Sequence, residues 1–398
     1  MIAHTKQRET GPLTHPTKSN IPVILETRVV CGTGGGPEKT ILNSPRYLEP
    51  AGYKTLCAYM HPPGDPGFEV LRRRAQEWNA PLLSVPDRGP LDMKVVSQLL
   101  DVCRRERVNI WHGHDYKSNA LGLLLQRLWP MRLVTTVHGW TVEAARTPLY
   151  YGIDRLCLRW YEKVICVSQD LFDQCLLAGV SKRKCVLVEN AIDTTDFART
   201  NSSEAAKRQL GLNPNRLLVG AVGRLSPEKD FDLLIRCLNR LIINGVDLEA
   251  VIVGEGDEKT RLERLVAELG CENRIHLMGY RPDPRPVFEA MDVFVLSSRR
   301  EGLPNVLLEA LAMEVPVVAT RIAGVPHLIC DGQNGLLVQP GDSDSLTSAL
   351  SRLLTDAALR TTLAQAGRHT VEARYSFEMR MKKISAIYDS VLNRRRAT

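Results

Sequence analysis

The sequence predicts an α/β protein built from two doubly wound domains, each a parallel sheet covered by helices on both faces. Short apolar runs rich in β-branched residues alternate with helical stretches along most of the 398 residues. Continuous apolar strands with helical crossovers are typical of buried parallel sheets. A polar, turn-rich stretch at 189–201 interrupts the alternation once, and a second series then begins. Two such halves leave a cleft between them, and ligands of these sheets bind beyond the carboxyl ends of the strands.

The first half opens with an apolar strand at 21–30 that leads into a glycine-rich loop at 31–36. A helix follows at 39–52, although Pro45 would bend it. Later strands are predicted at 54–59, 82–85, 108–112, 133–137, 163–167 and 185–188, with helices between them, for example at 91–106 and 119–128.

The second half repeats this pattern, and an amphipathic helix at 376–396 is expected to pack back across the junction. The predicted segments are a disordered tail at 1–20, Rossmann-like domains at 21–195 and 196–375, and a C-terminal helix at 376–398. Strands of the second half are predicted at 217–222, 248–253, 274–278, 293–297, 315–319 and 335–338, and helices at 230–244, 257–269, 286–290, 306–313, 343–355 and 357–372.

Composition is that of an ordinary soluble globular protein, with 44% apolar and 24% charged residues. No run approaches the about 20 apolar residues that a membrane span needs. Residues 1–20 are polar and contain Pro12 and Pro16, so they do not predict a signal peptide. Ten cysteines without a Cys-x-x-Cys pair favour reduced thiols in a cytoplasmic protein over a disulfide or zinc framework.

Positive charge is concentrated in residues 1–200, which hold 26 Lys and Arg against 20 Asp and Glu. Anionic membrane, nucleic acid or a phosphorylated substrate would suit this excess, and so would plain solvated helix faces. Nucleic acid is the weakest of these, because aromatic residues do not interleave with the basic runs. Those runs are Arg72-Arg73-Arg74, Arg104-Arg105-Glu106-Arg107 and Lys182-Arg183-Lys184.

The glycine-rich loop after the first strand matches neither common phosphate-binding motif. In Gly32-Thr33-Gly34-Gly35-Gly36-Pro37-Glu38-Lys39-Thr40 the spacing of a P-loop fails at Glu38, and that of a dinucleotide loop fails at Pro37. The backbone of Gly35 and Gly36 can still approach a ligand closely and donate N–H groups. A tight turn without a ligand is the alternative, and Gly254-Glu255-Gly256-Asp257 is predicted to be only a turn and helix cap.

Two cations follow the first strand of the second half, in Gly223-Arg224-Leu225-Ser226-Pro227-Glu228-Lys229-Asp230. Arg224 offers a planar fork for phosphate oxygens, and Lys229 offers a mobile point charge. Together with N–H donors they could offset the charge of a diphosphate. The alternative is an exposed arginine and lysine in a polar loop.

A pair of carboxylates stands eight positions apart at the start of an apolar helix, in Glu301-Gly302-Leu303-Pro304-Asn305-Val306-Leu307-Leu308-Glu309. Eight positions turn a helix by about 80° net and advance it about 12 Å, so both carboxylates can face one crevice at different depths. The helix N-terminus between them suits a phosphate. On spacing alone, two unrelated surface glutamates remain possible.

The histidines divide by position. His138 stands at a strand end in Val137-His138-Gly139, so it is expected to face the cleft and contact a sugar hydroxyl or a phosphate. His112-Gly113-His114-Asp115 resembles a metal cluster, but all its ligands lie on one loop without a distant partner, which favours a polar loop at a strand end. His276 and His327 give no specific signal.

These residues together resemble the retaining glycosyltransferases of family 4, which have the GT-B fold. The resemblance covers about residues 21–395 and is most specific over 217–340, where Val315-Pro316-Val317-Val318-Ala319-Thr320 and Gly324-Val325-Pro326 also match in order. It implies that 21–195 binds the acceptor and 196–375 the nucleotide-sugar. Pro37-Glu38-Lys39 departs from the usual first loop and leaves the acceptor open.

The resemblance also implies a role for each site residue. Arg224 and Lys229 would bind the diphosphate, and Glu309 the ribose hydroxyls. Glu301 would hold the hexose hydroxyls, and His138 would orient the hexose. Donor contacts are implied for the backbone of Gly302, Leu303, Asn305 and Val306, for Gly35 and Gly36, and for Tyr280 and Arg281 near the base.

The implied reaction moves a hexose from a UDP- or GDP-sugar to a saccharide, with retention and without a metal or other cofactor. The acceptor is expected to be lipid-linked, in cell-surface polysaccharide assembly, and the enzyme to be cytoplasmic with peripheral contact to anionic membrane at its inner face. Nucleic acid is not expected as a partner. A nucleotide-sugar epimerase of similar shape and a non-catalytic nucleotide-sugar-binding protein are the alternatives.

Overall fold

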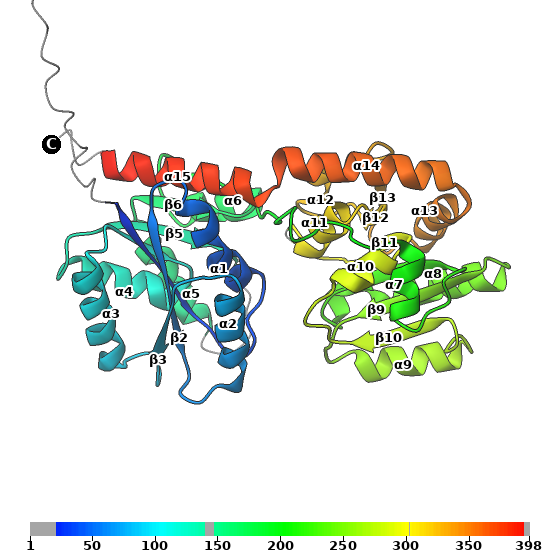
Figure 1. The fold of residues 1–398 in the computed structure, drawn as a ribbon, viewed down its shortest axis with the longest axis horizontal. Helices are drawn as coiled ribbons and strands as arrows, with labels where there is room; N and C mark the ends of the chain where they lie inside the picture. Colours follow the sequence, from blue (N-terminus) through cyan, green and yellow to red (C-terminus); the bar gives the residue numbers. More distant parts are fainter. Residues whose placement is uncertain (1–20, 140–146, 302, 394–398) are drawn as a thin grey trace, which may run out of the picture.

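The computed structural model describes residues 21–139, 147–301 and 303–393 and contains two parallel sheets, each within its own domain (Figure 1). The first sheet has seven strands in the order β3-β2-β1-β4-β5-β6-β7, and the second has six in the order β10-β9-β8-β11-β12-β13. Every pairing between these strands is parallel. The structure therefore confirms the predicted pair of doubly wound domains. The predicted tail at 1–20, Gly302 and the last residues from 394 lie outside the described residues.

In the N-terminal half, helices alternate with strands from β1 to β7. The elements are β1 (Val23–Val29), α1 (Gly36–Leu48), β2 (Lys54–His61), α2 (Pro66–Glu77), β3 (Leu82–Pro86), α3 (Met93–Glu106), β4 (Ile110–Gly113), α4 (Tyr116–Gln126), β5 (Arg132–Val137), α5 (Thr147–Leu158), β6 (Lys163–Cys166), α6 (Gln169–Leu177) and β7 (Cys185–Leu187).

The C-terminal half repeats the alternation and ends in three helices. Its elements are α7 (Ser203–Gln209), β8 (Leu217–Val222), the 3-10 helix η1 (Pro227–Lys229), α8 (Phe231–Ile243), β9 (Leu248–Val253), α9 (Lys259–Glu268), β10 (Ile275–Gly279), α10 (Arg285–Ala290), β11 (Val293–Leu296), α11 (Asn305–Ala312), β12 (Val317–Thr320), α12 (Val325–Leu328), β13 (Leu336–Val338), α13 (Ser343–Thr355), α14 (Ala357–Arg374) and α15 (Phe377–Asn393).

Helix α1 begins earlier than the predicted start at 39 because its first turn is capped. The Glu38 carboxylate accepts the backbone N–H of Gly35 at 2.6 Å, and Pro37 occupies the first turn, where its missing N–H costs nothing. Pro45 lies inside the helix, which ends at Leu48 rather than at 52.

The last helix crosses from the C-terminal half and packs on the N-terminal sheet. Figure 1 shows α15 over the N-terminal half and α14 over the C-terminal half. The chain crosses at a two-way backbone contact, since Ile192 N–H donates to Tyr375 C=O and Phe377 N–H donates to Ile192 C=O. Buried side chains of α15 then join the core beneath β1, β4 and β5, among them Phe377, Met381, Ile384, Ile387, Tyr388 and Val391.

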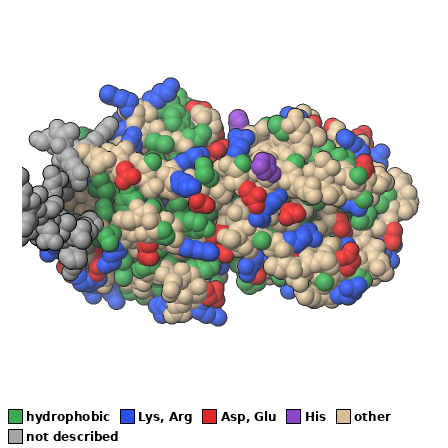
Figure 2. Space-filling view, turned by 45° about the horizontal axis from the view of Figure 1, so that its top comes forward, with side chains coloured by type: hydrophobic (Ala, Val, Ile, Leu, Met, Phe, Trp, Pro, Cys, Tyr) green, Lys and Arg blue, Asp and Glu red, His purple; other side chains and the backbone are tan. Residues whose placement is uncertain are grey.

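Two features are relevant to membrane contact: the length and apolarity of the described helices, and the hydrophobic side chains exposed on one face. None of the described helices is long and apolar enough to cross a membrane. Figure 2 shows the two halves as separate masses that meet at a waist, with exposed hydrophobic side chains more frequent on the N-terminal half of this face.

Strand register brings distant residues to one edge of the N-terminal sheet. Thr27 of β1 pairs with Gly113 of β4, and Gly113 pairs with Thr135 of β5. The residues that follow these strands therefore emerge side by side, which places His114 next to His138.

Candidate active site

A cavity of about 540 Å³ lies between the two halves of the molecule. Gly36, Lys39 and Arg73 line it from the N-terminal half, and Asn305 and Glu309 line it from the C-terminal half. The other lining residues come from α1, α2, the crossing segment near 191–197, the 282–285 loop and Phe377.

Lys229 and Glu301 form an ion pair in the C-terminal half. Ser298 Oγ donates to the same Glu301 oxygen at 2.8 Å, and Ser297 Oγ donates to the backbone carbonyl of Lys229, also at 2.8 Å. The contact forms because β8 and β11 are neighbours, so the loops that follow them meet. Both side chains are mostly buried, with exposed fractions of 16% for Lys229 and 14% for Glu301.

The loop that carries Arg224 is held by a second loop. Leu225 N–H donates to Glu255 C=O at 2.9 Å, and the Arg224 side chain is exposed. Gly254 and Gly256 both have positive φ, and a Cβ on either would lie 1.8 Å or 2.2 Å from a backbone oxygen of the Arg224 loop. The glycines predicted to form a turn therefore allow this close backbone packing.

Helix α11 begins at Asn305, four residues after Glu301, so Glu301 precedes the helix as the sequence predicts. Glu309 is buried within the helix and lines the cavity. Burial raises the pKa of Glu309, the positive charge of Lys39 opposes this rise, and the carboxylate of Asp283 adds to it. Of the two glutamates, Glu309 lines the cavity and Glu301 does not, although Glu301 lies in the loop that leads into the same helix.

Leu303 and Val306 contribute to the core through their side chains. Leu303 is buried, and Val306 packs against the same hydrophobic cluster. Only their backbone atoms are therefore suited to a ligand. Gly302, which was predicted as a backbone donor, lies outside the described residues.

The N-termini of α1 and α11 approach each other across the cleft. A Cβ on Gly36 would lie 2.4 Å from Asn305 Nδ2, whereas one on Gly35 would approach its neighbours no closer than 3.7 Å. Among the described residues, Asn305 Oδ1 is buried without a hydrogen-bond partner. Lys39, one turn into α1, also lines the cavity. In the sequence, Lys39 stands out only because Pro37-Glu38-Lys39 differs from the usual first loop of the family.

His138 is half-buried, and its Nε2 lies 3.0 Å from His114 Nδ1. Burial lowers the pKa of His138 well below its usual range, and the positive charge of Arg28 lowers it further. The ring is therefore neutral at neutral pH. Sequence reasoning singled out His138 but not its contact with His114.

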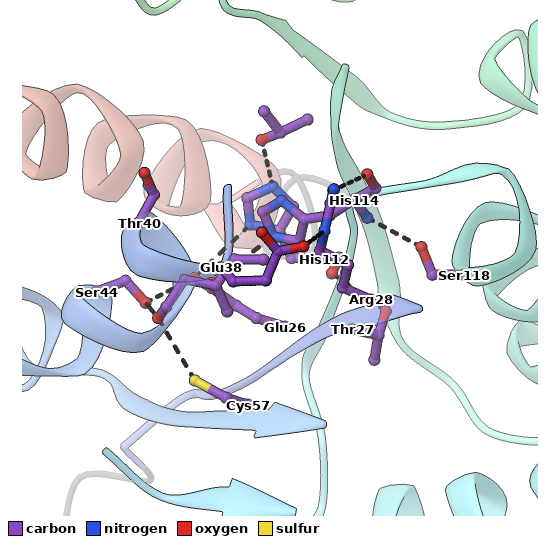
Figure 3. Close-up of polar contacts among 12 residues, drawn as sticks. Glu26, Thr27, Arg28, Glu38, Thr40, Ser44, Cys57, His112, His114 and Ser118 are labelled. Carbon is purple, nitrogen blue, oxygen red and sulfur yellow. Dashed lines mark hydrogen bonds and ion pairs between the residues drawn. The ribbon is translucent and has the colours of Figure 1, made fainter. Parts of the chain in front are cut away.

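The His112–His114 segment does have a distant partner, which corrects the expectation that it has none. Glu26 of β1 lies beside it, with Oε2 3.6 Å from His114 Nε2 and Oε1 4.0 Å from His112 Nδ1 (Figure 3). One ligand atom from each of these residues could lie within 4.8 Å of the others, as a metal site would require.

Existing contacts nevertheless favour a hydrogen-bonded cluster over a metal centre. Both ring nitrogens of His112 already have partners, Tyr388 Oη at 2.6 Å and Thr136 Oγ1 at 2.8 Å. The buried Arg380 guanidinium also interacts with Glu26 and would repel a metal cation.

Tyr280 and Arg281 are exposed and do not line the cavity. The next residues, Pro282 to Arg285, line it instead. Asp283 there forms an ion pair with Arg285 at 2.8 Å. In the segment predicted to lie near the base, the residues that line the cavity are therefore Pro282 to Arg285 rather than Tyr280 and Arg281.

Comparison with known proteins identifies the family of the chain. The family model "Glycosyltransferase Family 4" matches residues 34–196, and the model "Glycosyl transferases group 1" matches residues 202–370. Over 314 residues the chain is 28% identical to an Escherichia coli UDP-Gal:alpha-D-GlcNAc-diphosphoundecaprenol alpha-1,3-galactosyltransferase, covering 76% of this chain and 81% of the relative.

Two further similarities concern a second relative and a solved structure. The chain is 30% identical over 287 residues to a GDP-mannose-dependent alpha-(1-6)-phosphatidylinositol monomannoside mannosyltransferase of Mycolicibacterium smegmatis, covering 70% of this chain and 75% of the relative. The crystal structure of Anabaena HepE in complex with UDP superposes with a TM-score of 0.78 at 21% identity, covering 93% of this chain and 100% of HepE. This chain belongs to the family 4 glycosyltransferases and has their GT-B fold.

Proposed function

We propose that this glycosyltransferase moves a hexose from a UDP- or GDP-sugar to a saccharide acceptor and retains the anomeric configuration. The observation that carries the proposal is that Asn305, the first residue of α11, and the buried Glu309 line the cavity between the halves, and that Glu301, paired with Lys229, precedes this helix by four residues. In this proposal, Lys229 is the cation that binds the diphosphate. The carboxylate of Glu301 accepts hydrogen bonds from the hexose hydroxyls, and the carboxylate of Glu309 accepts them from the ribose.

Charge at the leaving group drives the proposed reaction. Cleavage of the anomeric bond leaves a diphosphate anion and an oxocarbenium-like sugar. Lys229, Arg224 and backbone N–H groups at the start of α11 stabilise the anion as it forms, and fixed groups of this kind commonly make the largest contribution to catalysis. The leaving phosphate takes the acceptor proton on the same face, so neither a general-base carboxylate nor a metal ion is needed.

We also propose a lipid-linked saccharide acceptor in cell-surface polysaccharide assembly. Two relatives support this, since their names specify a diphosphoundecaprenol-linked sugar and a phosphatidylinositol mannoside as acceptors. Such an acceptor would place the enzyme at the inner face of the cell membrane.

The membrane contact is proposed for the start of α3. Leu91 and Met93 are 91% and 69% exposed, and Arg88 and Lys94 are exposed beside them. This loop follows β3 and so lies at the carboxyl edge of the sheet, the edge that borders the cleft. Apolar side chains flanked by cations suit an anionic membrane surface.

Release of nucleotide tests the transfer reaction. A panel of UDP- and GDP-sugars is incubated with membrane extract as the acceptor source, and Lys229→Ala is compared with Lys259→Ala, which removes an exposed lysine paired with Glu255. We expect acceptor-dependent release that Lys229→Ala strongly reduces and Lys259→Ala leaves intact. Turnover of the donor without acceptor would point to an epimerase, and binding without turnover to a non-catalytic protein.

Sedimentation with phosphatidylcholine vesicles containing phosphatidylglycerol tests the membrane contact. Leu91→Asp should reduce binding at low salt. Leu177→Asp should not, because Leu177 is equally exposed, at 89%, but ends α6 at the opposite edge of the sheet. Equal loss in both variants would refute the proposed contact surface.

A further inference from the structure

A chain of buried polar side chains leads from His138 into the interior of the N-terminal domain. His138 Nε2 lies 3.0 Å from His114 Nδ1, and His114 Nε2 points toward Glu26. Among the described residues, His114 Nε2 has no hydrogen-bond partner within 3.5 Å, and the Glu26 Oε2 atom lies just beyond this limit, at 3.6 Å. Figure 3 shows the side chains of Glu26 and His114 converging from β1 and from the end of β4.

Glu26 is the anion at the inner end of this chain. Burial lowers the pKa of Arg380 only to about 10, so this buried guanidinium stays charged at neutral pH. Burial raises the pKa of Glu26, while His112, the hydroxyl group of Ser44, Arg380 and the hydroxyl group of Tyr388 oppose the rise. A protonated Glu26 would leave Arg380 as a buried cation without its facing carboxylate, which is the costly arrangement. The charge of Arg380 and the hydrogen bond that Ser44 Oγ donates to Glu26 Oε1 at 3.0 Å therefore favour the ionised form of Glu26.

The charge on Glu26 determines which ring nitrogen carries the proton in each of the two neutral histidines. Burial lowers the pKa of His114 and of His138 well below their usual range, so each ring carries a single proton. The nitrogen that carries the proton is determined by the partner of the other nitrogen. Next to an ionised Glu26, His114 carries its proton on Nε2, which leaves Nδ1 bare. A bare Nδ1 can only accept, so His138 must donate from Nε2, and its own Nδ1 is left without a proton.

We propose that Glu26 and His114 are positioning residues that fix His138 with its proton on Nε2, so that Nδ1 accepts a hydrogen bond from a hydroxyl group of the donor hexose. The inference rests on the proposed function, because it assigns a part of the sugar to His138. It also decides between two ligands that the sequence leaves open. A bare nitrogen attracts a hydroxyl hydrogen and repels a phosphate oxygen, so His138 reads the sugar and not the diphosphate.

A parallel branch of the same cluster supplies the control. His112 hydrogen-bonds to Thr136 Oγ1 at 2.8 Å and to Tyr388, but its ring nitrogens do not contact His138. Thr136→Val removes one buried hydrogen bond of a histidine close to the site while leaving the path from Glu26 through His114 to His138 intact.

Nitrogen-15 spectra of histidine-labelled protein report the tautomer directly, since protonated and bare ring nitrogens resonate far apart. The His138 signals are assigned from their loss in His138→Asn. We expect wild type and Thr136→Val to carry the proton on Nε2, and Glu26→Gln to populate the opposite tautomer. A wild-type His138 with its proton on Nδ1 would overturn the inference, as would unchanged populations in Glu26→Gln. His114→Phe, which removes the acceptor, should also abolish the preference and serves if Glu26→Gln does not fold.

Calorimetric titration then separates a role at the sugar from a general structural role. Its ligands are the nucleotide-sugar that supports turnover in the donor panel and its nucleoside diphosphate. Loss of one hydrogen bond should weaken binding of the nucleotide-sugar to Glu26→Gln about threefold to tenfold, with binding of the nucleoside diphosphate unchanged. Equal weakening of both ligands would contradict the assignment to the sugar. If the wild-type protein binds neither ligand, the proposed function fails, while the spectra still test the tautomer.

Discussion

At the scale of single residues, the ion pair between Lys229 and Glu301 joins two groups that would hold different parts of the donor. Without a donor, each charge neutralises the other. A diphosphate would compete with Glu301 for Lys229, because it brings a higher negative charge. Its binding would thereby free the carboxylate to accept hydrogen bonds from hexose hydroxyls. In the proposed reaction the pair would thus couple recognition of the diphosphate to recognition of the sugar.

Substitutions of the two partners should therefore have different effects. Lys229→Ala is expected to weaken binding of the nucleoside diphosphate by roughly 10-fold or more, the value of a hydrogen bond to a charged group. Glu301→Gln should bind the nucleoside diphosphate at least as well as wild type, because Lys229 is no longer neutralised, but should lower the rate of transfer roughly 10- to 100-fold. Titration calorimetry and the nucleotide-release assay measure the two effects. Weakened nucleotide binding in Glu301→Gln would count against the coupling.

Glu309 should show opposite effects on binding and on stability. Its folded-state pKa is raised by burial, so its stabilising contribution is fully present below the unfolded-state pKa and is lost as pH rises through the folded-state value. Glu309→Gln should therefore match wild type in thermal stability at acidic pH and exceed it at pH 8, while nucleotide affinity falls roughly 10- to 100-fold. Thermal unfolding at the two pH values checks the sign. A variant less stable than wild type at pH 8 would mean that the carboxylate stabilises the fold.

Site residues could be predicted from the sequence only where a local pattern, such as the end of a strand or the start of a helix, identifies them. Lys229, Glu301 and Glu309 could be proposed as site residues from local patterns, because Lys229 and Glu301 lie in segments that follow β8 and β11, and Glu309 lies one turn into α11. The contact between His114 and Glu26 could not be found, because it depends on the register of β1 against β4, which no local pattern specifies. Lys39 and Asp283 were not predicted as neighbours of Glu309, because their electrostatic influence on it arises between segments that are distant in the sequence.

At the scale of elements, the close approach of α1 to α11 makes Gly36 a sensitive position. Gly36→Ala would force Asn305 to move, since the new Cβ would lie 2.4 Å from its amide nitrogen. We expect the KM for the donor to rise roughly threefold to tenfold through a lost hydrogen bond, without loss of thermal stability, because alanine favours the helix. Gly35→Ala is the matched control, with no neighbour closer than 3.7 Å. Equal kinetic effects in both variants would show that Asn305 is not the cause.

For helix α15, the sequence pattern predicts that the helix forms but not where it packs. Its apolar stripe predicts an amphipathic helix, and the structure forms one from Phe377. The stripe does not specify which core it joins. That follows from the crossing at Ile192, which directs the helix to the N-terminal sheet, where Tyr388 and Arg380 reach His112 and Glu26.

At the scale of the whole molecule, the two-sheet architecture could be predicted because buried parallel strands are continuous apolar runs. Among the described residues, ten of the thirteen strands keep at most one polar side chain within their buried core. The exceptions are β1 with Glu26 and Thr27, β2 with Thr55 and His61, and β5 with Thr135 and Thr136. The strand order could not be obtained from such runs alone. It depends on crossovers that bring β1 beside β4, and β8 beside β11, so the switch points between the halves of each sheet form the cleft.

The charge balance of the cleft leads to the prediction that transfer does not need a metal ion. Lys229 and Arg224 and the N-terminus of α11 together oppose the about two negative charges of a diphosphate, which a divalent cation would otherwise offset. Two Asp-x-Asp pairs do occur, but their carboxylates already have partners and none of them lines the cleft cavity. In Asp230-Phe231-Asp232, Asp230 pairs with Arg299, and Asp232 pairs with Arg236 and Arg261. In Asp342-Ser343-Asp344, Asp342 caps α13 and Asp344 pairs with Arg240.

Transfer rates measured after exhaustive treatment with EDTA should therefore equal those measured with added Mg²⁺ or Mn²⁺. Lys229→Ala provides the complementary measurement, because removing the protein's own cation should make any residual activity respond to Mg²⁺. A wild-type enzyme that loses its activity in EDTA and regains it with Mn²⁺ would show that the positive charges of the cleft are insufficient. The diphosphate would then have to be held by an ion recruited with the donor, since Glu301 is proposed to hold the sugar and Glu309 the ribose rather than the phosphates.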